Sequence, residues 1–192
     1  MVISTAFASS RGGESDKTLP LNRAIRDTLL SSDRERNDLL EALVKDRAMV
    51  EGSLINALIG AKNDEDKILA VYLSGLYRLV GTIPELAKII NLETPDAIQK
   101  RESLWGQFPV VEALICIGQP VVPSMLQLIK ESTDIKSIEH ATTVVLHVEG
   151  EKVAEFIFQN AFDVESDNEK RARLATALRF LKVESERRKN AK

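Results

Sequence analysis

A chain of 192 residues is long enough for one substantial hydrophobic core or for a short array of repeats. Hydrophobic residues make up 44% of it and charged residues 29%, which excludes a collagenous chain and a chain that is disordered throughout. Aromatic residues are only 5%, whereas Leu, Ala, Ile, Glu and Lys recur along the chain, a balance that favours helices over β-sandwiches and barrels. The composition therefore predicts an all-α protein.

The formal net charge of −3 at pH 7 is unevenly distributed. Residues 169–192 carry nine Lys and Arg against three Glu, so this end is basic and the rest of the chain is acidic. A basic end can contact nucleic acid or an acidic surface. It is also the pattern of a solvated terminal helix whose acidic start and basic end complement the helix dipole, and this is the interpretation that we favour.

Residues 1–18 are predicted to be a disordered leader, because they are rich in Ser and Gly. The stretch "AFASS" resembles the small-residue cleavage site of a secretory signal, although the charged start and most of the apolar stretch of such a signal are absent. The protein is therefore expected to be either cytoplasmic or exported. No uninterrupted apolar run approaches the roughly 20 residues that span a bilayer, so we expect a soluble protein without a membrane span.

A single domain is predicted over residues 19–183, and it begins with a helix near "LPLNRAIRDTLL", residues 19–30. After it, an apolar segment ends in glycine four times, at Gly52, Gly81, Gly118 and Gly150, and each time a second apolar segment follows. The intervals between these glycines are 29, 37 and 32 residues. Within segments such as 68–80, apolar residues recur every three or four positions, as in a helix. Repeats of this length are typical of stacked helix pairs.

The turn between the two helices of a unit is clearest in "LICIGQPVVPSMLQLI", residues 114–129. Gly118 can adopt the left-handed conformation that closes the first helix. Pro120 and Pro123 cannot continue that helix, but each suits the first turn of the next one. Pro84 is expected to act in the same way after Gly81, with Thr82 as an N-cap.

Three further local features are expected from the sequence. Cys116 is the lone cysteine, so it can form no internal disulfide, and it is expected to be buried in its apolar run. The acidic run at 64–66 should open a helix, where negative charge favours the dipole. The connection from 91 to 108 is longer than a usual helix connection, and Thr94-Pro95-Asp96 could open a short helix within it.

The segment 112–132 resembles the HEAT-like repeats related to those of phycobilisome lyases, which read as an Ala/Leu-rich helix, Ile-Gly, a proline turn and an apolar helix. The positions that carry the resemblance are Ala113, Leu114, Ile117, Gly118, Pro120, Val122, Pro123 and Leu126. Looser copies contain Ile138, Ala141, Leu146, Val148, Gly150 and Val153, and then Arg171, Ala172, Ala175 and Leu178.

This resemblance covers about residues 33–182. It implies a right-handed superhelical α-solenoid of stacked antiparallel helix pairs, of the HEAT and armadillo type, with about four repeats plus caps. Glu139 stands where such repeats often carry arginine, and no unit has the full ladder from Asp to Arg that joins neighbouring turns. An irregular, compact superhelix is therefore expected rather than an even one.

No catalytic, cofactor-binding or metal-binding residue is predicted. His140 and His147 are the only histidines, and a spacing of seven residues places them about 10 Å apart on one helix face, too far for one metal ion. We interpret them as structural or surface residues. No nucleophile turn or phosphate loop is present in the sequence.

The second helices usually line the concave surface of HEAT-like proteins, and this surface is expected to bind another protein. The residues expected to be exposed on it are Glu85, Lys88, Gln127, Lys130, Glu155 and Gln159. Trp105, in the long connection, is a further candidate for contact with a partner, although we favour a role in core packing for it and for Phe108.

The sequence therefore predicts a non-enzymatic protein-protein interaction module or scaffold. Two alternatives remain open. One is nucleic-acid binding through the basic end, which includes a tail at residues 184–192. Against it, the body is acidic, and aromatic and basic residues do not interleave. The other is a bilin-lyase-like enzyme or chaperone subunit, which rests on the resemblance alone.

Overall fold

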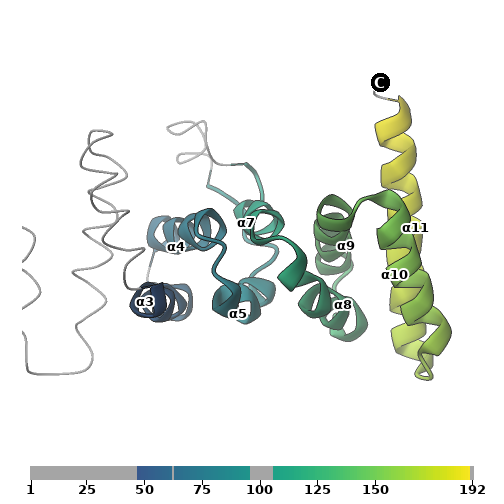
Figure 1. Cartoon of the computed structure of the whole chain (residues 1–192), viewed down its shortest axis with the longest axis horizontal. Helices are drawn as coiled ribbons and strands as arrows, with labels where there is room; N and C mark the ends of the chain where they lie inside the picture. The colour runs from purple at the N-terminus through teal and green to yellow at the C-terminus, as the bar shows by residue number, and fades with distance from the viewer. Residues whose placement is uncertain (1–46, 62, 96–105, 191–192) are drawn as a thin grey trace, which may run out of the picture. The chain divides into compact units, whose positions relative to one another are not determined.

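The computed structural model describes residues 47–190 except 62 and 96–105 (Figure 1). The chain divides into two compact units, Met1–Ser53 and Leu54–Lys192, and each is described by itself. The described residues form helices and contain no strand, which confirms the predicted all-α class. The predicted leader and the helix expected at 19–30 lie outside the described residues, as does Trp105.

The helices follow one another with short connections, apart from the one after α5. In chain order they are α3 (Arg47–Gly60), α4 (Asp64–Leu76), α5 (Ile83–Lys88), α7 (Pro109–Ile117), α8 (Val122–Glu131), α9 (Ile135–Glu149), α10 (Glu151–Val164) and α11 (Asn168–Asn190). Two 3-10 turns, Val80–Thr82 and Gln119–Val121, lead into α5 and α8. Residues 184–190 of the predicted basic tail thus continue α11.

Two of the four predicted glycine ends are confirmed. Gly118 follows α7 with φ 87° and ψ −151°, and Gly150 follows α9 with φ 80° and ψ 165°. The ψ values are extended, so this is not the left-handed helical region but one that only glycine occupies readily. Each amide donates to a carbonyl four residues back, of Leu114 at 3.2 Å and of Leu146 at 3.0 Å. Pro123 then lies in the first turn of α8, as predicted.

The other two predicted glycine ends are wrong. Gly52 lies inside α3. Helix α4 ends at Leu76, and the residue in the left-handed region after it is Arg78, with φ 50°, rather than Gly81.

The end of α4 is closed by packing and by two backbone hydrogen bonds. The amide of Leu79 donates to the carbonyl of Ser74 at 2.9 Å, and that of Arg78 donates to the carbonyl of Gly75 at 3.0 Å. This is the Schellman pattern, which places a buried apolar residue just after the left-handed one. Leu79 is that residue, and it is almost fully buried. Burial of Leu79 thus fixes the turn although the left-handed position carries an arginine.

Local capping also differs from expectation at one helix and agrees at another. Thr82 occupies the N-cap position of α5, but its hydroxyl donates to the carbonyl of Leu79 at 2.7 Å and does not cap the helix. Helix α4 begins at Asp64, as the acidic run predicted. Its cap is Asn63, whose side-chain oxygen accepts from the amide of Asp66 at 2.8 Å.

Cys116 is exposed, which contradicts the predicted burial. The core side of α7 is formed by Val110, Leu114 and Ile117, at the three- and four-residue spacing of one helix face. Cys116 instead shares the outward side with Glu112, four residues before it. Because residues 113–117 are all apolar, their spacing does not show which face of the helix Cys116 lies on.

Within the unit Leu54–Lys192, most of the larger helix contacts join helices that are not adjacent in the chain. Helix α4 packs on α7, α7 on α9 and α9 on α11, while α5 packs on α8 (Figure 1). Helix α10 contacts α9 and α11, which precede and follow it in the chain, and α11 also contacts α8. The core between these helices is apolar and includes Leu86, Leu114, Met125, Val144, Phe158 and Leu174.

In the described part of the chain, no single helix has the length and apolar character of a membrane span. The segments Pro109–Ile117 and Gln119–Glu131 reach these criteria only as a pair, which is bent by 114°.

Candidate interaction surface

Apart from Trp105, which lies outside the described residues, the predicted partner-binding residues lie on three helices that do not all pack together. Glu85 and Lys88 are on α5, and Gln127 and Lys130 are on α8, which contacts α5. Residues 155 and 159 are on α10, whose main contacts are with α9 and α11. The structure therefore brings the first four residues onto neighbouring helices and places the last two on a helix that packs elsewhere.

Most of these side chains already have partners close by. The Lys88 ammonium is 2.8 Å from the carboxylate of Glu85, on the preceding turn. Gln127 donates to Glu131, and Gln159 donates to Asp163 at 2.8 Å. A partner that bound there would have to compete with these contacts.

Lys130 has a structural role at the end of α8. Its ammonium is 2.9 Å from the carboxylate of Glu165, just after α10, and this contact lowers the pKa of Glu165. Its carbonyl accepts from Arg173 Nη1 at 2.6 Å, while Arg173 Nη2 lies 3.0 Å from the carboxylate of Glu169. Lys130 thus joins α8 to the residue that follows α10 and to the first two turns of α11.

A groove of about 590 Å³ lies between the start of α9 and the side of α11, and we call it the α9–α11 groove. It is lined by Ser132, Thr133, Ile135, Ile138, Glu169, Ala172, Arg173, Thr176, Arg179, Phe180 and Val183. The lining combines an apolar floor with hydroxyl groups and arginines. The volume lies within the range of sites that bind ligands.

The walls of the groove expose apolar side chains to solvent. Ile135, on α9, is 61% exposed, and Val183, on α11, is 47% exposed. Phe180, also in the lining, is half-buried, and Ile138 is buried. These apolar side chains are thus gathered at one concave site rather than scattered singly over the surface.

Capping at α9 and spacing in α11 create this lining. The carboxylate of Asp134 accepts from the amides of Lys136 and Ser137, at 3.2 and 3.1 Å, so α9 begins at Ile135. The side chain of Ile135 therefore lies in the exposed first turn of the helix. On α11, the lining residues recur every three or four positions from 169 to 183, so they share one face of the helix.

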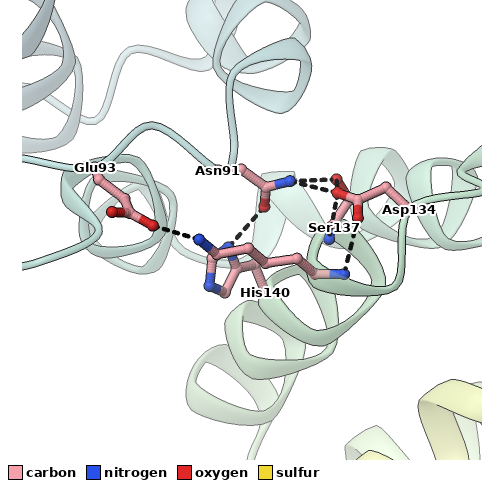
Figure 2. A network of polar contacts seen from close by, with 6 residues as sticks. Asn91, Glu93, Asp134, Ser137 and His140 are labelled. Atoms are coloured by element: carbon pink, nitrogen blue, oxygen red, sulfur yellow. Dashed lines mark hydrogen bonds and ion pairs between the residues drawn. The ribbon is translucent and has the colours of Figure 1, made fainter.

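A network of polar side chains fixes the start of α9 (Figure 2). The Asn91 amide nitrogen, just after α5, donates to Asp134 at 2.5 Å and to the hydroxyl of Ser137 at 2.9 Å. The Asn91 oxygen lies 2.9 Å from His140 Nδ1. Next to it, Lys136 forms an ion pair with Glu93. The network ties the chain after α5 to the first two turns of α9, which carry the groove residues.

His140 is a structural member of this network. Burial and the positive charge of Lys136 lower the pKa of His140, so its neutral form is favoured. Its ring packs against Phe108, with the centroids 4.3 Å apart, which supports the predicted packing role of Phe108. The hydroxyl of Ser137 donates to Asp134 at 2.8 Å, so it is not aligned as a nucleophile on the imidazole.

Among the described residues, no group of three or more His, Cys, Asp and Glu side chains could hold a metal ion.

The two ends of the long connection between α5 and α7 are held together by Thr94. Its amide donates to the carbonyl of Gln107 at 3.0 Å, and its hydroxyl donates to the carbonyl of Gly106 at 2.7 Å. Thr94 and Pro95 are outside any helix, and the short helix that they were expected to open would fall outside the described residues.

Sequence reasoning missed both the groove and the network. The network joins Asn91 to residues 43 to 49 positions later, and the groove joins residues of α9 and α11 that belong to different predicted units. One local signal was available. Asp134 directly before an apolar helical stretch is an N-cap pattern, and it would have marked the start of α9 at Ile135.

No protein family model, curated protein or solved structure matches this chain.

Proposed function

We propose that this protein is a non-enzymatic protein-interaction module, in which HEAT-like helix pairs stack as a right-handed solenoid and a partner binds in the α9–α11 groove. The order of helix contacts supports the stacking: α4, α7, α9 and α11 pack in succession, and α5 packs on α8. In a repeat protein each unit contacts its neighbours, and this order of contacts therefore supports the proposal. The placement of α10, which packs on α9 and α11, fits an irregular array better than an even one.

The observation that carries the functional proposal is the exposure of Ile135, from α9, and Val183, from α11, in the lining of one groove. Covering apolar surface is the main favourable term in association, so an exposed apolar groove gains free energy when a partner fills it. The second-helix surface is the less favoured site, because residues such as Lys88 and Gln159 are held in contacts one turn away.

The two alternatives receive less support from the described side chains. A basic surface for nucleic acid would use Arg171 and Arg173, but the first lies over the ring of Phe162 at 4.6 Å and the second is bonded to Glu169 and to the carbonyl of Lys130. An active site would use a group such as His140, which is held by Asn91 and packed on Phe108.

The proposal is tested by affinity capture from cells that express the protein, with one groove variant and one control. Ile135→Asp places a charge in the groove at a helix start that tolerates acidic residues. Phe156→Asp changes a side chain of α10 that is 71% exposed and lies outside the groove. We expect the wild type and the Phe156 variant to retain the same protein in stoichiometric amount, and the Ile135 variant to lose it. Equal retention by all three, or retention of nucleic acid alone, would refute the proposal.

A further inference from the structure

The α9–α11 groove has the length of a helical segment. Its lining on α11 runs from Glu169 to Val183, which corresponds to about 21 Å, or four turns, at 1.5 Å per residue. The walls are helices, and no strand edge exists among the residues that the structure describes, so strand addition is not available there. An amphipathic helix that lays its apolar side on Ile135, Phe180 and Val183 fits this site.

The charges of the groove are not balanced along its length. At one end, Arg173 is neutralised by Glu169, 3.0 Å away. At the other end, Arg179 is exposed and donates to the hydroxyl of Thr176 at 3.0 Å, with no carboxylate within ion-pair distance among the described residues. Its guanidinium thus keeps a full positive charge beside the apolar floor and can bind a carboxylate through two parallel hydrogen bonds.

We infer that the partner segment is an amphipathic helix with one apolar face and with carboxylates on the flank that lies beside Arg179. This inference rests on the proposed function and adds the chemistry of the partner to it. The apolar face of the segment covers the exposed side chains of Ile135 and Val183. The carboxylates of its acidic flank form ion pairs with Arg179. A basic helix would place like charges beside this arginine, which is unfavourable, so the site selects against basic helices.

The test uses the full chain and three fluorescent peptides of about 18 residues, or five helical turns. All three carry the same leucine face, and the remaining positions are Glu and Ala, Gln and Ala, or Lys and Ala. Binding is measured by fluorescence anisotropy at about 50 mM and about 500 mM salt, because screening separates charge from apolar contact. Arg179→Glu is the charge variant, and Lys182→Glu is its control, since Lys182 is exposed on α11 outside the groove lining and gives the same change in net charge.

We expect the Glu peptide to bind at least about tenfold more tightly than the Lys peptide at low salt, and this preference should shrink at high salt. Arg179→Glu should weaken binding of the Glu peptide about fivefold, and Lys182→Glu should change it by less than about twofold. Ile135→Asp should weaken binding of all three peptides.

Two results would overturn the inference, and they differ in what they leave standing. If the Glu and Gln peptides bind equally and Arg179→Glu changes neither, the acidic flank is wrong, while sensitivity to Ile135→Asp would still support the groove. If no peptide binds, or if Ile135→Asp has no effect on binding, both the inferred partner and the groove as the docking site are contradicted.

Discussion

Gly75 of α4 packs directly against Ala113 of α7. A Cβ atom at position 75 would lie 2.7 Å from the Cα of Ala113 and 3.0 Å from its Cβ, closer than side chains approach in folded proteins. The two helices can therefore be this close only because position 75 has no side chain. The contact joins α4 to α7, two helices that pack on each other in the unit Leu54–Lys192.

Gly75→Ala should separate α4 from α7 and lower the free energy of unfolding by about 1–3 kcal/mol, because the added methyl group overpacks the interface. Urea denaturation measures the change. The matched control is Gly52→Ala in the interior of α3, where a Cβ would meet nothing within 4 Å and helix propensity should add about 0.5–1 kcal/mol. Equal effects of the two substitutions would mean that the approach of α4 to α7 is not tight.

Gly118→Ala should cost about 1–3 kcal/mol for a different reason. A Cβ at this position has open space around it, so the cost comes only from holding alanine at φ 87° and ψ −151°. Gly60→Ala is the control, since that position also has open space but no positive φ. A Gly118 variant as stable as the Gly60 variant would show that the turn does not need the glycine conformation.

Asn91→Ala should lower the free energy of unfolding by about 1–2 kcal/mol, since it removes the hydrogen bonds from its amide to Ser137 and Asp134 and from His140 to its oxygen. Asn160→Ala, on the exposed side of α10, should cause no loss. Thermal unfolding compares the two. Hydrogen exchange should also become faster in the first two turns of α9 when Asn91 is removed, and unchanged protection there would contradict the pinning role of the network.

His140 should make stability depend on pH. Burial and Lys136 lower the pKa of its imidazole from 6.5, against the weaker opposing effects of Glu139, the backbone of Ile90 and Asp134. The unfolded chain therefore binds a proton at a higher pH than the folded one, so stability from this group is complete above about pH 6.5 and declines as the pH falls towards 5. In His140→Gln, the slope of unfolding free energy between about pH 7 and pH 5 should be smaller. An unchanged slope would mean that the histidine is solvated in the folded state.

Helix type and much of the turn chemistry were predictable, because they depend on neighbours within a few residues. The spacing of apolar residues gave the helices, and α7 and α9 end at Gly118 and Gly150 as expected, although ψ at both glycines is extended rather than left-handed helical. The error at Gly81 has a tertiary cause: burial of Leu79 closes α4 early and forces Arg78 into the left-handed region. Sequence alone does not show which apolar residue the core will take.

The candidate site was less predictable than the fold. The expected surface residues were chosen because they are polar residues on the second helices, but polar residues one turn apart tend to satisfy each other, as Gln159 and Asp163 do. The groove is lined by Ile135 and Val183 together, and these residues are 48 positions apart in the sequence, on two different helices. An apolar residue that remains exposed cannot be told from a core residue by its type.

Site-specific photocrosslinking in living cells tests most directly whether the α9–α11 groove holds a protein partner. The photoreactive residue p-benzoylphenylalanine is placed at position 135 in the groove or, as a control, at position 156 on the exposed side of α10. We expect one discrete protein adduct from position 135 and none from position 156, and Arg179→Glu should reduce the adduct. The same adduct from both positions, or no adduct from position 135, would contradict the claim.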